Sequence, residues 1–275
     1  MVIEFDVPVT GGRLHAYDTG GDGVPVVWHH GTPNLGAPPE PLFAAAERLG
    51  LRWVSYDRPG YGGSTPAPGR DFASAARYTA AVADHLGLGR FAVFGHSGGG
   101  PHALACAALL PERVFAAVSV SGLAPISAES LDWFAGMASG SEATLRASAA
   151  GRTALASHLA AEGETDIGFA DVDWAALEGE WGWFGKVVGP AIAAGPAAQI
   201  DDDLANAGAW GFDPASITVP VLLMHGDRDR MVPSTHSAWL AGHIPGAQYR
   251  HWADEGHVSV LRHAEEALEW LARSA

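Results

Sequence analysis

Apolar and amphipathic stretches alternate along most of this chain. Short apolar or alternating runs predict eight strands, over residues 2–9, 13–18, 24–30, 51–56, 91–94, 114–121, 219–225 and 247–252. Longer stretches predict helices between the strands, over residues 39–49, 71–87, 101–110, 234–242 and 258–273. This alternation is typical of an α/β fold, in which helices cover both faces of a mostly parallel sheet. The first two strands are expected to form an antiparallel pair.

The alternation stops at Gly122. Residues 123–216, which we call the inserted segment, show no clear strand pattern and several alanine-rich stretches that favour helix. They hold 14 of the 31 acidic residues but only three of the 16 Lys and Arg. We therefore predict an α/β core over residues 1–122 and 217–275, with a helical cap over 123–216 inserted between two strands of the sheet.

Composition narrows the possible partners. The net charge of −15 disfavours nucleic acid and anionic membranes, because both require a basic protein surface. Cys106, the single cysteine, excludes an internal disulfide and is expected to pack within a helix. The chain starts without the basic and apolar regions of a signal peptide, and no apolar run is long enough to span a bilayer. The sequence thus predicts a cytoplasmic protein that acts on a small molecule, and leaves its oligomeric state open.

The segment from Phe91 to Leu110 carries the main chemical signal. An apolar strand runs into Gly95-His96-Ser97-Gly98-Gly99, and an alanine-rich helix follows at once. Such a strand–turn–helix presents the serine of G-x-S-x-G at a sharp turn, beside the amides of a helix N-terminus. We expect Ser97 to have a positive φ, and Gly95 and Gly99 to let strand and helix pass closely. The motif is short, so its weight depends on the residues that the rest of the chain supplies.

A serine hydroxyl needs a base within hydrogen-bond reach, and histidine has the pKa suited to that task. His257 follows the last predicted strand, at the sheet edge where Ser97 emerges. A carboxylate must then orient the imidazole, and Asp229 follows the preceding strand at the same edge. The order Ser97, Asp229, His257 agrees with a serine triad on an α/β sheet.

With these motifs in register, the chain resembles the α/β-hydrolases that carry a helical cap, over essentially the whole core. The resemblance rests on His30-Gly31, Asp57-Arg58-Pro59-Gly60-Tyr61-Gly62, Gly95 to Gly99, Gly226 to Pro233 and Gly256-His257. It implies an eight-stranded α/β-hydrolase fold, with Asp229 rather than Asp227 as the acid. It also implies an oxyanion hole formed by the backbone N–H groups of Thr32 and Gly98. Since the Thr32 amide would act, its side chain is expected to be dispensable.

Other candidate metal-binding and substrate-binding residues have weaker support from the sequence. His29 and His30 point to opposite faces of a strand and have no third ligand at zinc spacing, so no metal site is predicted. His30 and His96 are candidates for substrate binding, although His30 is more simply explained by bracing its loop. From the inserted segment, apolar side chains would face the substrate; the candidates are Trp133, Trp181 and Trp183. Its acidic residues are expected to be mostly solvated.

We predict a serine hydrolase that cleaves a small ester or lactone through an acyl-enzyme on Ser97, without a cofactor. By the resemblance, a serine at this position excludes the epoxide hydrolase and haloalkane dehalogenase branches, which use an aspartate nucleophile. Cofactor-free perhydrolysis and a proline iminopeptidase activity remain alternatives on the same triad. The peptidase is disfavoured because His30-Gly31-Thr32-Pro33-Asn34 and Gly95-His96-Ser97-Gly98-Gly99 differ from the motifs of that family. A non-catalytic binder of the same fold is a second alternative.

Overall fold

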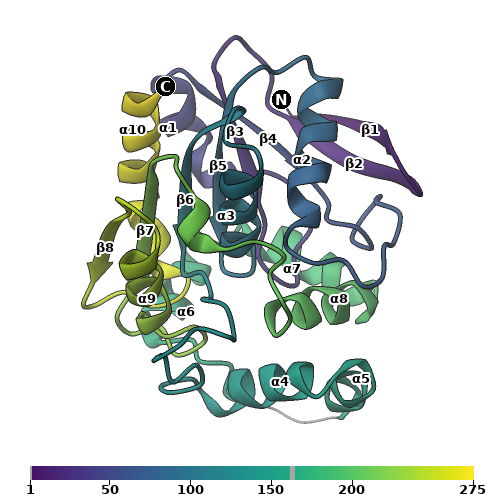
Figure 1. The fold of residues 1–275 in the computed structure, drawn as a ribbon, viewed down its shortest axis with the longest axis vertical. Helices are drawn as coiled ribbons and strands as arrows, with labels where there is room; N and C mark the ends of the chain where they lie inside the picture. Colours follow the sequence, from purple (N-terminus) through teal and green to yellow (C-terminus); the bar gives the residue numbers. More distant parts are fainter. Residues whose placement is uncertain (1, 162–164) are drawn as a thin grey trace.

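The computed structural model describes residues 2–161 and 165–275. Its centre is an eight-stranded sheet in the order β1-β2-β4-β3-β5-β6-β7-β8 (Figure 1). The strands are β1 Ile3–Val9, β2 Gly12–Asp18, β3 Val24–His29, β4 Leu51–Tyr56, β5 Phe91–His96, β6 Val114–Val120, β7 Val221–Gly226 and β8 Gln248–Trp252. Only β2 pairs antiparallel with its neighbours β1 and β4, and all other pairs are parallel. The predicted α/β fold with a mostly parallel sheet is confirmed.

The two faces of the sheet are covered by different helices, because successive strand residues point to opposite sides. Val27 and Val93 belong to one buried cluster, together with residues of α2 (Ser74–His85), α3 (Gly99–Leu109) and α9 (Thr235–His243). Val26 and Phe94 belong to a second cluster, with residues of α1 (Phe43–Arg48) and α10 (Ala264–Ser274). Both faces are therefore apolar, which explains the continuous hydrophobic runs of the central strands.

Between β6 and β7, the described residues form helices joined by loops, with no strand among them. The helices are α4 Ser139–Ala149, α5 Arg152–Ala160, α6 Asp171–Glu178, α7 Phe184–Ala193 and α8 Ala197–Asn206. Figure 1 shows these helices gathered at one end of the sheet, with α4 and α5 farthest from it. Of the helices in the described residues, none is long and apolar enough to cross a membrane.

Several element boundaries differ from the sequence prediction. The helix expected from residue 71 begins at Ser74, because Asp71 accepts hydrogen bonds from the backbone N–H and hydroxyl of Ser74 in a preceding turn. Short 3₁₀ turns, η1 Glu40–Leu42 and η3 Ser259–His263, precede α1 and α10, and η2 Pro214–Ser216 precedes β7. Such turns are common at helix starts and do not alter the fold.

Candidate active site

Ser97 lies at a sharp turn between β5 and α3. Its φ is 56°, as predicted, and its backbone N–H donates to the carbonyl of Val120 on β6 at 2.8 Å. A Cβ on Gly95 would lie 2.1 Å from the carbonyl oxygen of Gly99, and one on Gly99 would lie 1.9 Å from that of His29. Both glycines are required by this close approach, and the strained Ser97 backbone is held by the packing around it.

Ser97, His257 and Asp229 form one hydrogen-bonded chain, assembled from loops after β5, β8 and β7. Ser97 Oγ lies 2.9 Å from His257 Nε2, and His257 Nδ1 lies 2.7 Å from Asp229 Oδ2. With its proton on Nδ1, the imidazole donates to the carboxylate and accepts from the hydroxyl. The structure thus brings together the three residues that the sequence predicts to carry the reaction.

Asp229 is held in place from both sides of its carboxylate. Oδ1 accepts from the backbone N–H groups of Met231 and Val232, at 2.9 and 2.8 Å. Oδ2 faces His257 and also lies 3.2 Å from His225 Nε2. Although burial opposes ionisation, the charges and hydrogen bonds of the two histidines hold the pKa of Asp229 well below its usual range. Asp227, the rival acid, instead contacts the ring of His251 at the surface.

His257 is buried and has a raised pKa. Burial opposes protonation of the imidazole, but the Asp229 carboxylate and, to a smaller extent, the Asp173 carboxylate raise the pKa of His257 above its ordinary value. The neighbouring His96 behaves in the opposite way, because burial and then the charge of His257 lower the pKa of His96 to about 3. Of these two histidines, His257 is therefore the one whose surroundings favour protonation.

Asp173, on α6 of the inserted segment, holds the loop of His257. Its Oδ1 accepts from the backbone N–H groups of Val258 and Ser259, both at 2.8 Å. Its Oδ2 accepts from the N–H of His257 at 3.2 Å and of Ala170 at 2.9 Å. The side chain is fully buried, so this carboxylate depends on those four amides in place of water. No sequence signal identified Asp173.

Two backbone amides near Ser97, those of Thr32 and Gly98, are candidates for an oxyanion site. In the part of the chain that the structure describes, neither Thr32 nor Gly98 donates its backbone N–H to another group. The two residues are neighbours, since a Cβ on Gly98 would lie 3.7 Å from the Thr32 amide nitrogen. Paired, preorganised N–H donors of this kind can stabilise an oxyanion next to a serine.

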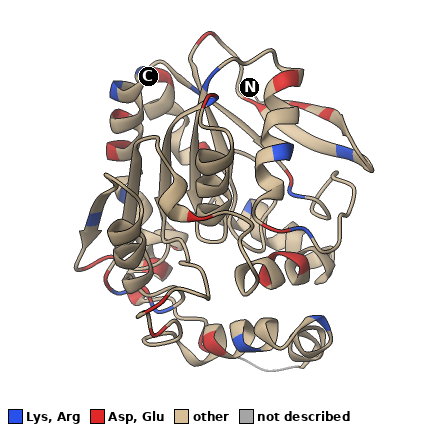
Figure 2. Ribbon diagram, viewed as in Figure 1, with Lys and Arg blue, Asp and Glu red and all other residues tan. Residues whose placement is uncertain are grey.

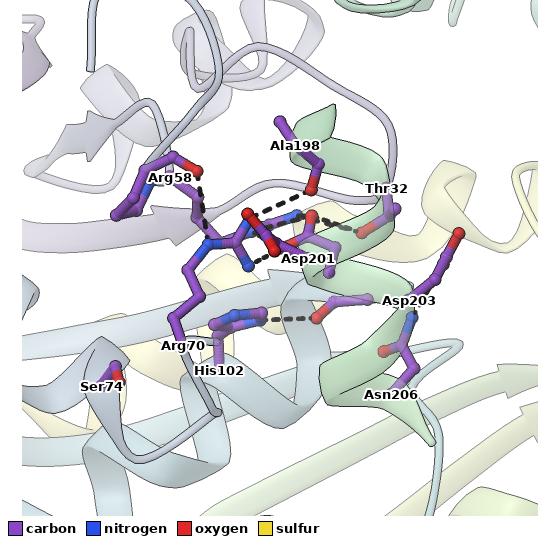
Figure 3. Close-up of polar contacts among 12 residues, drawn as sticks. Thr32, Arg58, Arg70, Ser74, His102, Ala198, Asp201, Asp203 and Asn206 are labelled. Atoms are coloured by element: carbon purple, nitrogen blue, oxygen red, sulfur yellow. Dashed lines mark hydrogen bonds and ion pairs between the residues drawn. The ribbon is translucent and has the colours of Figure 1, made fainter. Parts of the chain in front are cut away.

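A buried ion-pair network holds the Thr32 loop (Figure 3). Thr32 Oγ1 donates to Asp202 of α8 at 2.8 Å and accepts from Arg58 at 3.1 Å. Arg58 also pairs with Asp202 at 2.5 Å and donates to the carbonyl of Gly31 at 2.9 Å. Arg70 contacts the other oxygen of Asp202. The sequence predicts that the Thr32 side chain is dispensable. In the structure this side chain links its loop to the inserted segment through Asp202.

The expectation that the acidic residues of the inserted segment are mostly solvated is wrong for those nearest the site. Asp202 is 1% exposed and Asp203 is 6% exposed. Although burial opposes ionisation, Arg58 and Arg70 hold the pKa of Asp202 well below its usual range. Burial, and then the neighbouring Asp202 carboxylate, raise the pKa of Asp203 to about 7. Adjacent helix positions point in directions about 100° apart, so a run of three aspartates cannot all face solvent on a packed helix.

The pocket at Ser97 has two lobes, which share Thr32 and Ser97. We call the first the polar lobe, after the side chains of Ser141, Thr144, Gln199, Asp203 and Asn206 in its lining; it encloses about 190 Å³. Apolar side chains complete the lining of this lobe: Pro33, Leu123, Leu145, Ile167, Met231 and Val232. The second, the apolar lobe, encloses about 460 Å³ and is lined by residues that include Phe169, Leu177, Phe184, Val188, Ile192 and His257. Concave sites of mixed character are typical of small-molecule binding.

The predicted substrate-binding residues divide into two groups. His96 lines the apolar lobe, whereas His30 lines neither lobe and braces its loop by accepting from the backbone N–H of Arg58 at 3.1 Å. The placement of Trp133, Trp181 and Trp183 in the pocket is wrong. All three are buried in hydrophobic clusters outside the described lining, because their large rings stabilise packing between helices.

Among residues 2–161 and 165–275, no group of three or more His, Cys, Asp or Glu side chains has an arrangement that could hold a metal ion. Cys106 is fully buried on α3, and burial raises the pKa of its thiol to about 12. This thiol is therefore a packing group and not a reactive one.

Known proteins share the fold of this chain. The model of the alpha/beta hydrolase fold family matches residues 24–264. The chain belongs to this family. It is a hydrolase of this fold, as the sequence motifs predict.

Relatives of this α/β-hydrolase are named for different activities. A non-heme chloroperoxidase of Streptomyces lividans is 32% identical over 79% of this chain and 78% of its own length. A 2-hydroxymuconate semialdehyde hydrolase of Pseudomonas putida is 29% identical over 94% of this chain and 89% of its own. Among solved structures, the enol-lactonase of Burkholderia xenovorans LB400 superposes with a TM-score of 0.73, at 20% identity, over 98% of this chain and 99% of the other.

Proposed function

We propose that this α/β-hydrolase cleaves small esters or lactones through an acyl-enzyme on Ser97. The observation that carries the proposal is the position of Ser97 Oγ, 2.9 Å from His257 Nε2 and beside the two unpaired amides. An activated hydroxyl and an oxyanion site together are what acyl transfer requires. The solved structure named as an enol-lactonase has the same fold, which agrees with a lactone as one candidate substrate.

The first half of the reaction forms the acyl-enzyme. Ser97 Oγ attacks the substrate carbonyl while its proton moves to His257 Nε2. The negative charge on the carbonyl oxygen is held by the amides of Thr32 and Gly98, each worth about 3 kcal/mol to the transition state by analogy with other oxyanion holes. Asp229 holds the imidazolium that forms. His257 then donates the proton to the leaving alcohol oxygen, and the C–O bond to that oxygen breaks.

The second half releases the acid. Water enters, His257 accepts one of its protons, and the water oxygen attacks the acyl carbon. The bond to Ser97 Oγ breaks, and the proton returns from His257 to the serine. In this proposal residues 123–216 act as a cap over a core of residues 1–122 and 217–275, because α6 and α8 contact the loops that carry His257 and Thr32.

Intact mass after incubation with a fluorophosphonate tests the proposal. Wild type is expected to gain one phosphonyl adduct, and Ser97→Ala is expected to gain none while keeping its fold by circular dichroism. Ester turnover should fall by about 10⁴-fold or more in that variant. Folded wild type without an adduct would overturn the proposal and favour the non-catalytic binder.

The relative named as a chloroperoxidase favours a second activity on the same residues. Hydrogen peroxide could replace water in the second half-reaction, so that the acyl group leaves Ser97 as a peracid. Turnover of an acetate ester with excess peroxide, followed by bromide oxidation, measures the peracid. Bromide oxidation that depends on both the ester and Ser97 supports this activity, and oxidation that survives Ser97→Ala contradicts it.

A further inference from the structure

The three consecutive aspartates of α8 have different partners. Asp201 pairs with Arg152, and Asp202 pairs with both Arg58 and Arg70. Asp203, within the described part of the chain, has no cationic side chain in salt-bridge contact, although it is 6% exposed. The ribbon of α8 is red at its acidic residues in Figure 2. A buried carboxylate is costly when no cation or full set of hydrogen-bond donors offsets its loss of water.

Asp203 faces the pocket that holds Ser97. It lines the polar lobe, together with Gln199 and Asn206 from the same helix. Those two side-chain amides are the hydrogen-bond donors to Asp203, each at 3.3 Å, near the long end of the hydrogen-bond range. A carboxylate offers about four acceptor sites, so Asp203 retains capacity for another donor. A group that enters the lobe can supply such a donor.

The position of His257 decides which part of a substrate enters each lobe. His257 lines the apolar lobe and is absent from the described lining of the polar lobe, whereas Gly98 lines only the polar lobe. The histidine must reach the leaving-group oxygen to protonate it. The leaving alcohol is therefore expected to extend into the apolar lobe. The acyl chain, on the other side of the carbonyl carbon, extends into the polar lobe.

We propose that the polar lobe selects acyl groups that carry a hydrogen-bond donor, a hydroxyl or an ammonium group, which donates to the Asp203 carboxylate. The inference rests on the proposed acyl-enzyme at Ser97 and specifies its substrate class. The enzyme would thus act on esters of short hydroxy- or amino-acids with an apolar alcohol.

Three phenyl esters of equal acyl length test this selection: butanoate, 3-hydroxypropanoate and 3-aminopropanoate. They share one leaving group and differ only in the terminal methyl, hydroxyl or ammonium. For wild type at pH 8, kcat/KM for at least one donor-bearing ester is expected to exceed that for butanoate about 10-fold, as for a hydrogen bond to a charged group. Which of the two is preferred identifies the donor.

Variants of Asp203 test whether the preference depends on its carboxylate or only on the size and shape of the pocket. Asp203→Leu is expected to reverse the preference in favour of butanoate. Asp203→Asn is expected to keep a preference for the hydroxyl ester and to lose one for the ammonium ester, because it retains an acceptor but no charge. Asp201→Asn is the matched control on the same helix, with unchanged ratios. Fluorophosphonate labelling of each variant shows that Ser97 is still assembled.

The outcomes distinguish this inference from the proposed function. Labelling by the fluorophosphonate, with butanoate preferred or with ratios unmoved in Asp203→Leu, would overturn the role of Asp203 and leave the acyl-enzyme intact. Absence of both labelling and turnover would overturn the proposed function itself. A donor preference that disappears in Asp203→Leu, with Asp201→Asn unchanged, supports the assignment.

Discussion

The carboxylate of Asp173 accepts a hydrogen bond from the backbone N–H of His257, 3.2 Å away, across 84 residues of sequence. The same carboxylate holds the next two amides of the loop. A helix of the inserted segment thus sets the position of the histidine that faces Ser97. A second carboxylate of the inserted segment, Asp202 of α8, accepts a hydrogen bond from the Thr32 hydroxyl. The inserted segment therefore contributes to the geometry of the site as well as to the lining of its pocket.

Loss of the Asp173 charge should shift the pH profile. Asp229 and Asp173 raise the pKa of His257, so removing one carboxylate lowers it. The proposed reaction needs neutral His257, so kcat/KM is expected to fall as pH drops through this pKa. In Asp173→Asn the acidic limb is therefore expected to move to lower pH, while kcat falls by up to about 10²-fold through misplacement of the loop.

The measurement is kcat/KM from pH 5 to 9 on one neutral ester. Asp171→Asn, at an exposed position in the same helix, is the control and should keep the wild-type profile. A lowered melting temperature with an unmoved acidic limb would show that Asp173 supports the fold alone.

Asp202→Asn should destabilise the fold. The change leaves Arg58 and Arg70, both buried, without their shared counter-charge, which costs about 3–5 kcal/mol in buried pairs. Asp201→Asn breaks a pair with Arg152, whose side chain is 47% exposed, and should change stability by about 1 kcal/mol or less. Urea unfolding of both variants measures the difference, and equal losses would contradict the structural importance of this network.

The Thr32 hydroxyl should matter through the loop that it holds. Thr32→Ala removes the hydrogen bonds of the side chain to Asp202 and Arg58. Because the backbone N–H at position 32 is then held less firmly toward the oxyanion, kcat is expected to fall about 10-fold. Thr32→Ser keeps the hydroxyl and should stay close to wild type. The measurement is kcat on one ester and the rate of fluorophosphonate labelling, for wild type, Thr32→Ala and Thr32→Ser. Equal rates in Thr32→Ala and wild type would show that the Thr32 side chain is dispensable, as the sequence predicts.

Gly95→Ala should disrupt the turn that carries Ser97. Its Cβ would lie 2.1 Å from a backbone oxygen, so strand and helix must separate, at about 3 kcal/mol or more. Gly242→Ala, on α9 where a Cβ meets nothing within 4 Å, should stay within about 1 kcal/mol of wild type. Thermal unfolding compares the two. A normal melting temperature for Gly95→Ala would refute the close approach.

Much of the fold follows from local patterns. Continuous apolar runs such as Phe91–Phe94 are buried on both faces of a parallel sheet, and the helices between them have alanine- and leucine-rich sequences. Ser97, His257 and an acidic residue after β7 could be predicted because each follows the end of a strand, and the carboxyl ends of parallel strands meet at one edge. Their mutual distances come from the same topology. The choice of Asp229 over Asp227 came from the resemblance to the family.

The inserted segment is different, because its helices pack on loops far away in the sequence. Nothing local to Asp173 or Asp202 distinguishes a carboxylate that accepts buried amides from one in water, and local composition likewise placed Trp133, Trp181 and Trp183 in the wrong environment. The sequence by itself determined the sheet, the turn at Ser97 and the candidate triad, since these depend on periodicity and chain order. Tertiary structure decided which acidic groups are buried and how the pocket divides, since these depend on packing between distant segments.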